Sequence, residues 1–491
     1  MIHLRKLKNK AQVPVILLVF LILLTSFCKK KETASPQLNI SSSEIAFLPE
    51  GGTANVTVTS NAKWNTKNPA DSWLQLDQVT GNEGDTKLKF TVSANATGVS
   101  RSAVLVIASD NGQARRLTLS QASNLFPSYN TSPKAPDQTG MNSTAVQLAS
   151  KLHLGWNIGN TMESPGGESG WGNPQITESY IKFVKQTGFN AVRIPCAWDW
   201  KHLSDRQKAT IDPAWLNRVK EVVKYCVDND MYVLLNIHWD GGWLENNINS
   251  IKKDSVNAKQ KALWEQIATS MRDFDEHLMF ASANEPAADN ADQVAILNGY
   301  HQTFINAVRS TGGRNSYRVL VVQGPGTDPD KTNNLMNTLP TDQVAGRLMV
   351  EVHNYTPSQF TILDNDATWG KMFYYWGTGH HSTIQPDRNA TWGEESEHIR
   401  IFGLMKSKFI DKGIPVILGE YGAYKRGGTK NVPLDLAAHN ASVDYWNNYV
   451  TRQAIQFGLK PFFWDTGNAL DRRNNTVLDQ GTINALVTGG K

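Results

Sequence analysis

The segment from Asp212 to His238, with the sequence DPAWLNRVKEVVKYCVDNDMYVLLNIH, contains the clearest structural pattern of the chain. It opens with Asp212 and Pro213, residue types typical of a helix N-cap and of the first helical position. Apolar side chains then recur with a helical period and predict one buried helix face, formed by Trp215, Val219, Val222, Val223 and Cys226. The apolar run over residues 232–238 predicts a buried strand directly afterwards. The segment is therefore one helix followed by one strand.

The same alternation of helix and strand continues from about Met141 to the end of the chain. Helical patterns separate seven further apolar runs, which cover residues 154–159, 191–197, 278–284, 318–323, 348–355, 415–420 and 461–464. Eight parallel strands that alternate with helices are typical of a closed barrel. We therefore predict a (β/α)₈ TIM barrel, an α/β fold, over residues 141–489. A doubly wound parallel sheet is the alternative.

Residues 36–123 follow a different pattern. Short alternating runs, among them residues 55–59, 87–92, 103–107 and 116–119, are separated by turn clusters rich in Gly, Asn and Asp. This spacing predicts a small all-β, immunoglobulin-like sandwich before the barrel. Trp64 and Trp73 are expected in its core, because a domain of this size needs aromatic side chains for burial. The polar residues 124–140 contain three prolines and are predicted to be a linker.

The N-terminus has the pattern of an export signal. Basic residues through Lys10 precede an apolar run from Val13 to Leu24, which is shorter than the roughly 20 residues needed to span a bilayer. The run ends at Cys28 and resembles a bacterial lipobox, although Phe27 stands where a small residue is expected. We predict that residues 1–27 are a signal peptide and that Cys28 is the lipidated first mature residue. An ordinary signal peptide is the alternative, and both export the protein.

The overall charge excludes a general affinity for nucleic acid. The formal net charge is +4, but residues 1–27 contain four basic and no acidic side chains, so the mature chain is neutral. Cys196 and Cys226 belong to no short-spaced metal or redox motif and are expected to be buried thiols. We infer no metal and no cofactor. We expect a monomer that meets the membrane only through its lipid anchor, at the outer membrane, at the cell surface or facing the periplasm.

Polar side chains lie at the carboxyl ends of the predicted strands, where a barrel of this kind builds its active site. They come from different strands and can converge on one cleft: Asn157, Arg193, His238, Asn284, Glu285, His353, Tyr355, Glu420 and Trp464. Glu285 ends the fourth strand and Glu420 the seventh. Two facing carboxyl groups are what glycoside hydrolysis requires, one to protonate the leaving oxygen and one to attack or to activate water.

The barrel resembles glycoside hydrolase family 5, of clan A, and looks most similar to its endoglucanase and xyloglucanase members. The matching segments are Gly155–Thr161, Trp171–Pro174, Gly188–Pro195, Asn236–His238, Asn284–Pro286, Val352–Tyr355, Gly419–Gly422 and Phe463–Asp465. The segment from Ala62 to Ala122 resembles a BACON domain, a small sandwich attached to many Bacteroidetes carbohydrate enzymes. That resemblance leaves open whether the sandwich binds glycan or is a spacer.

The resemblance implies a retaining endo-acting enzyme that cleaves β-1,4-glucosidic bonds of cellulose, xyloglucan or mixed-linkage glucan. Mannan or xylan as the substrate, and a surface glycan-binding protein without activity, are the alternatives. Glu285 would be the acid/base and Glu420 the nucleophile. Asn284 would bind the sugar 2-hydroxyl, Arg193 and Tyr355 would support the nucleophile, and His238 and His353 would order the cleft. Trp464 would form the floor of the subsite just before the cut, and Asn157 and Trp239 are further expected substrate-binding residues. Many relatives have a second histidine where this chain has Trp239.

Two further expectations concern the cleft. To act first as an acid, Glu285 must hold its proton near neutral pH, so burial and the charge of Glu420 are expected to raise its pKa. The aromatic-rich segment 356–393 follows the sixth strand and is too long for an ordinary connection. It is expected either to form a wall of the glycan cleft or to pack within itself.

Overall fold

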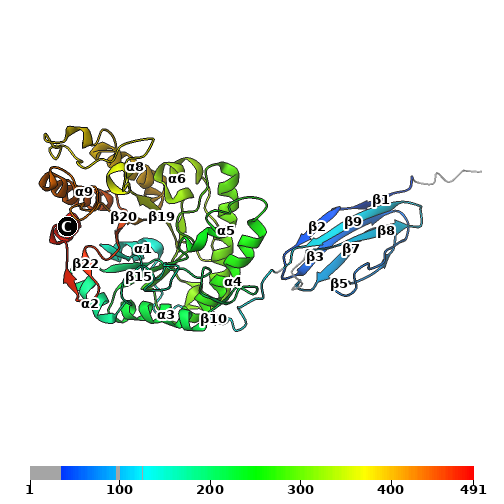
Figure 1. Ribbon diagram of the computed structural model, residues 1–491. Coiled ribbons are helices and arrows are strands. Elements are labelled where there is room, and N and C mark those ends of the chain that lie inside the picture. The colour runs from blue at the N-terminus through cyan, green and yellow to red at the C-terminus, as the bar shows by residue number, and fades with distance from the viewer. Residues whose placement is uncertain (1–34, 96–99, 124) are drawn as a thin grey trace, which may run out of the picture. The chain divides into compact units, whose positions relative to one another are not determined.

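The computed structural model describes residues 35–95, 100–123 and 125–491, so the predicted signal peptide and Cys28 lie outside the described residues. Contacts divide the chain into two compact units, an N-terminal β-sandwich and a C-terminal barrel domain (Figure 1). Among the described helices, none combines the length and the apolar character that a membrane-spanning helix needs. The predicted fold, a small sandwich before a TIM barrel, is confirmed.

The N-terminal unit is a sandwich of two sheets. One sheet has the order β1 (Leu38–Ile40), β3 (Gly52–Ser60), β7 (Gly84–Val92) and β5 (Leu74–Leu76). The other has the order β2 (Glu44–Phe47), β9 (Ala114–Gln121), β8 (Arg101–Ser109), β4 (Trp64–Asn65) and β6 (Thr80–Gly81). Alternate side chains of the long strands are buried between the sheets. Trp64 is 1% exposed and Trp73 packs against the same core, as predicted.

Eight parallel strands close the barrel in chain order. They are β11 (Gly155–Ile158), β12 (Ala191–Ile194), β15 (Tyr232–Asn236), β16 (Leu278–Ala281), β18 (Leu320–Gln323), β19 (Leu348–Asn354), β20 (Val416–Tyr421) and β21 (Lys460–Asp465). Each falls on one of the eight apolar runs. The closed strand order excludes the doubly wound alternative.

Helices surround the barrel, and Figure 1 shows α3 to α6 and α8 and α9 outside the strands. The helices are α1 (Ala145–Lys151), α2 (Glu178–Gln186), α3 (Pro213–Asp228), α4 (Lys253–Met271), α5 (Ala291–Ser310), α6 (Pro329–Leu335), α7 (Ser358–Thr361), α8 (Glu395–Lys408), α9 (Leu436–Gln456) and α10 (Gln480–Gly489). Minor strands pair β13 (Leu203–Asp205) with β14 (Thr210–Ile211) and β22 (Leu470–Asp471) with β23 (Thr476–Val477). The predicted N-cap of α3 is present, since Asp212 accepts the N–H of Ala214.

Successive side chains along each strand point alternately toward the helices and toward the inside of the barrel. Outward residues such as Val192, Val233 and Val350 pack against the helices in the main core, which also contains the free, buried Cys196 and Cys226. Inward apolar residues form a separate cluster with α1. This cluster includes Leu148, Ala191, Leu234, Met279, Met349, Ile417 and Phe462. On three of these strands the residue two positions later on the same face is polar, and these residues, Arg193, Asn236 and Glu351, lie at the site end of the barrel.

One irregularity in β20 changes which way its last residues point. The pairing between β19 and β20 slips by one residue, so that Val352 pairs with Leu418 but His353 pairs with Glu420. Gly419 is the extra residue of this bulge, and a Cβ there would lie 2.0 Å from a carboxylate oxygen of Glu351. A bulge redirects the side chain that follows it. Here the bulge brings the Glu420 side chain to the inner face of the barrel. Strict alternation from the inward residue Ile417 would place that side chain on the outer face.

The barrel domain begins upstream of residue 141. Within the predicted linker, the backbone N–H of Tyr129 and the hydroxyl of Ser128 donate to the buried carboxylate of Glu265 in α4, at 2.6 and 3.1 Å. The strand β10 (Lys134–Pro136) pairs in parallel with β17 (Gly312–Gly313). Residues 128–136 are therefore part of the barrel domain rather than a free connection.

Candidate active site

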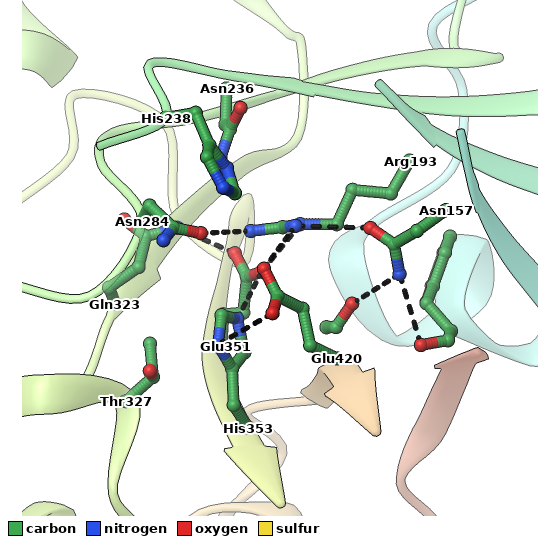
Figure 2. Close-up of polar contacts among 12 residues, drawn as sticks. Asn157, Arg193, Asn236, His238, Asn284, Gln323, Thr327, Glu351, His353 and Glu420 are labelled. Carbon is green, nitrogen blue, oxygen red and sulfur yellow. Dashed lines mark hydrogen bonds and ion pairs between the residues drawn. The ribbon is translucent and has the colours of Figure 1, made fainter. Parts of the chain in front are cut away.

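The guanidinium of Arg193 in β12 is the centre of the polar cluster (Figure 2). Arg193 is fully buried. Its Nη1 donates to Glu420 Oε1 at 2.8 Å, and its Nε lies 2.9 Å from Glu351 Oε1. A buried charge is stable only when it is paired and hydrogen-bonded, and both carboxylates meet that need.

Two asparagines flank this guanidinium (Figure 2). Asn284 Oδ1 accepts from Arg193 Nη2 at 2.7 Å, which leaves the amide nitrogen to donate to a ligand. Asn157 Oδ1 accepts from Arg193 Nη1 at 3.1 Å, and its Nδ2 donates to the carbonyl of Gly419 at 2.8 Å. Asn157 and Arg193 are both 0% exposed. These two side chains therefore position Glu420 and Asn284 from beneath the cleft.

His353 lies between three carboxylates. Its Nδ1 is 2.8 Å from Glu285 Oε1 and 3.7 Å from Glu420 Oε2, and its Nε2 is 3.2 Å from Glu351 Oε1. Burial acts to lower the pKa of His353, but Glu420, Glu285 and Glu351 outweigh it and raise that pKa to about 10. The ring is therefore an imidazolium at neutral pH, and each of its nitrogens donates to a carboxylate.

The two predicted catalytic carboxylates meet at this ring. One oxygen of Glu285, one of Glu420 and one ring nitrogen of His353 all lie within 4.8 Å of one another. The Tyr355 hydroxyl donates to Glu420 Oε2 at 3.1 Å. Burial raises the pKa of the Tyr355 phenol, so it remains a donor. These three groups are also close enough to one another to surround a metal ion.

The pKa of Glu285 differs from the expectation. Partial burial acts to raise the pKa of Glu285, whose side chain is 46% exposed. The hydrogen bond and charge of His353 outweigh that effect, and the net shift in the pKa of Glu285 is downward. Burial raises the pKa of Glu420 against the pull of His353 and Arg193. The expected raised pKa of Glu285 is therefore wrong for this arrangement, because it left out a cation bonded directly to that carboxylate.

Trp464 lines two hollows, of which the larger is also bordered by both carboxylates. The larger has a volume of about 530 Å³ and is bordered by Glu285, Glu420, Tyr355, Ile362, Asp364, Arg426 and Asn468, among others. The smaller has about 180 Å³ and contains three exposed indoles, of Trp171, Trp200 and Trp239, together with His238. The ring of His238 stacks on Trp464 at 5.7 Å between centroids. Burial, Arg193 and His353 lower the pKa of His238, so that ring is neutral.

A sequence model for cellulases, glycosyl hydrolase family 5, matches residues 157–470 and thus spans this whole cluster. The chain belongs to glycosyl hydrolase family 5. The prediction of a family 5 glycoside hydrolase of the endoglucanase type is confirmed. The BACON model, which describes an N-terminal binding domain, matches residues 62–122 and confirms the predicted sandwich type.

Individual relatives extend this match. A xyloglucan-specific endo-beta-1,4-glucanase of Bacteroides ovatus is 31% identical over 498 residues, which cover 96% of this chain and 96% of the relative. Endoglucanase A of Paenibacillus barcinonensis is 32% identical and covers 76% of this chain and 96% of its own. The solved structure of a Bacteroides ovatus family 5 xyloglucanase with a XXXG heptasaccharide has a TM-score of 0.68 at 30% identity, covering 92% of this chain and all of that one.

The long segment after β19 of this family 5 domain divides between the two expected roles. Its aromatic cluster packs inward, since Phe373, Tyr374, Tyr375 and Trp376 are at most 6% exposed. Its first turn borders the larger hollow through Thr361, Ile362 and Asp364. Arg426 ties this turn to the loop after β20 by donating to the carbonyl of Leu363 at 2.8 Å. The cleft wall is therefore residues 361–364, and most of the aromatic side chains stabilise the loop behind it.

Sequence reasoning missed two buried glutamates of the site. Glu351 is two positions before His353 in β19, so both face the same side of the barrel, and a charge inside an apolar strand was a usable signal. Glu245 lies in the loop between β15 and α4, and its carboxylate accepts the backbone N–H groups of Asn284 and Glu285. Nothing in the residues around Glu245 indicated this contact.

The charge of His353 predicts a pH-dependent stability. A group whose pKa rises on folding, here from an ordinary 6.5 to about 10, adds stability that is complete below pH 6.5 and lost as the pH rises toward 10. His353→Gln lacks this contribution. The gap in unfolding temperature between the native chain and His353→Gln should therefore be several degrees near pH 6.5 and should narrow toward pH 10. Thermal unfolding followed by circular dichroism measures it, and a gap that stays constant would show that His353 is neutral.

Proposed function

We propose that this chain is a retaining endo-β-1,4-glucanase in which Glu420 is the nucleophile and Glu285 the acid/base. The supporting observation is the placement of the two carboxylates just beyond β16 and near the end of β20, with oxygens within 4.8 Å of each other and a shared contact to His353. Retaining glycosidases hold their carboxyl groups about 5 Å apart, whereas inverting enzymes leave room for a water between them.

The first chemical step forms a covalent intermediate. Arg193 and Tyr355 hold one carboxylate oxygen of Glu420 each. One of these oxygens attacks the anomeric carbon as the bond from that carbon to the leaving oxygen breaks. Glu285 gives its proton to the leaving oxygen. In the second step Glu285 takes a proton from water while the water oxygen attacks the same carbon. The ester bond to Glu420 then breaks, and both carboxyl groups return to their starting state.

The first step needs the proton on Glu285, and His353 supplies a way to place it there. Its Nδ1 is already 3.7 Å from Glu420 Oε2, so a small movement transfers the hydrogen bond from Glu285 to the nucleophile. Glu285 then loses the cation that lowers its pKa and keeps the neighbouring negative charge of Glu420, which raises it. Turning Glu285 toward a leaving oxygen has the same effect.

Among plant β-glucans, we propose xyloglucan as a substrate. The Bacteroides ovatus xyloglucanase matches cover 96% of this chain by sequence and 92% by structure, and the larger hollow offers about 530 Å³ beside the two carboxylates. Hydrolysis of xyloglucan, cellulose, mixed-linkage glucan, mannan and xylan should be compared by reducing-end release. We expect xyloglucan and mixed-linkage glucan to lead. Preference for mannan or xylan would contradict the proposal, and release from none would favour a glycan-binding protein without activity.

We also propose that the mature protein is an exported lipoprotein anchored through Cys28. The support is the basic, apolar and cysteine order of residues 1–28 together with a neutral mature chain. Expressed in a Gram-negative host, the native chain should enter the membrane fraction and Cys28→Ala should be released as a soluble exported protein. Equal membrane association of both would contradict lipidation of Cys28.

The division of labour between the glutamates predicts opposite substrate dependence. Glu285→Gln should lower kcat/KM on β-glucan by about 10²- to 10⁴-fold but spare a dinitrophenyl β-cellobioside, whose leaving group needs no proton. Glu420→Gln should abolish turnover of both, because no other group can attack. Steady-state kinetics on the two substrates measure this. A Glu420→Gln variant that keeps a tenth of native activity on either would remove Glu420 from the nucleophile's role.

A further inference from the structure

The acid/base residue lies beyond the end of its strand. β16 ends at Ala281, and Glu285 lies four residues later in the chain. The pairing of β16 with its neighbours β15 and β18 also ends at Ala281. Side chains take the place of strand partners there. The N–H of Ala283 donates to Gln323 Oε1 at 2.8 Å, and those of Asn284 and Glu285 both donate to Glu245 Oε1, at 3.0 and 2.6 Å.

The Glu245 residue is anchored on both sides of these contacts. Its own carbonyl accepts the N–H of Ala287 at 3.1 Å, so it bonds to three of the backbone N–H groups around Glu285. Its loop is fixed at the other end by Asp240, which accepts the backbone N–H groups of Trp198, Asp199 and Trp200 at 2.7 to 2.9 Å. Glu245 is 4% exposed and borders neither hollow. It is therefore out of reach of a substrate in the cleft.

We infer that Glu245 is a positioning residue, whose carboxylate oxygen sets the backbone from which Glu285 reaches the leaving oxygen. This rests on Glu285 being the acid/base, as proposed above. A buried N–H without an acceptor costs about 1–3 kcal/mol, so the loss of Glu245 makes the backbone at Asn284 and Glu285 turn toward another acceptor. Small displacements of a catalytic group cost large factors in rate.

The contribution of Glu245 is its acceptor oxygen rather than its charge. Burial raises the pKa of Glu245 to about 8, and the negative charge of Glu285 acts in the same direction. Near neutral pH the side chain can therefore be uncharged, and a protonated carboxyl still accepts hydrogen bonds at Oε1. Glutamine presents the same oxygen at the same distance from the backbone, whereas alanine presents none.

The test compares kcat/KM of β-glucan hydrolysis with kcat/KM of dinitrophenyl β-cellobioside cleavage, which needs no acid. For Glu245→Ala we expect a fall of about 30-fold or more on β-glucan and of less than about 3-fold on the aryl substrate. Glu245→Gln should recover most of the loss. If Glu245→Ala does not fold, Glu245→Asp, which draws the oxygen back by one methylene, should show the same split at about 5-fold.

Glu265 provides the matched control, because it is also a buried glutamate that accepts two backbone N–H groups, those of Tyr129 and Asn130, and it borders neither hollow. Glu265→Ala should lower the unfolding temperature and leave the ratio of the two activities unchanged. Equal losses on both substrates in the Glu245 variants, or no loss, would overturn the inference. Absence of the split in Glu285→Gln would instead contradict the proposed function.

Discussion

The buried guanidinium of Arg193 is the interaction on which the rest of the site depends. A cation without access to water must be neutralised, and removing one partner of such a buried pair costs about 3–5 kcal/mol. Arg193 finds its partners on four other segments of the barrel, through Asn157, Asn284, Glu351 and Glu420. The contacts that close the barrel around Arg193 are therefore the same contacts that orient the carboxylate of Glu420.

Charge balance links this arrangement to the chemistry. Arg193 and His353 are positive, and Glu351, Glu420 and Glu285 are negative when ionised, so the fully ionised cluster has one negative charge in excess. A single added proton makes the cluster neutral, which is the state that a poorly solvated site favours. The first step of a retaining hydrolysis needs one proton on the acid and none on the nucleophile. The charges of the cluster thus favour one proton shared between Glu285 and Glu420. The contacts of His353 with these two carboxylates decide which of them holds that proton.

Much of this could be predicted from sequence because apolar runs mark the strands and polar residues mark their ends. All eight strands, the closed barrel and the meeting of Glu285 with Glu420 follow from that pattern and from the family resemblance. The direction in which the Glu420 side chain points could not be predicted in this way. Strict alternation would place that side chain on the outer face of the barrel, and only the bulge at Gly419 turns it inward. The lowered pKa of Glu285 depends on a 2.8 Å contact with His353 that has no signature along the chain. The contacts of residues 128–136 with the barrel were likewise hidden, because a proline-rich polar stretch looks the same whether it is free or bound.

The proposed role of Glu420 as the nucleophile depends on Arg193 and Tyr355, which hold its carboxylate. Its most direct test is incubation of the native enzyme with a dinitrophenyl 2-deoxy-2-fluoro-β-cellobioside, which forms the covalent intermediate faster than water can break it down. Peptide mapping by mass spectrometry should find the fluorosugar on the peptide that contains Glu420, in a one-to-one ratio with enzyme. A label on Glu285, or an active enzyme that never accumulates a label, would contradict the account.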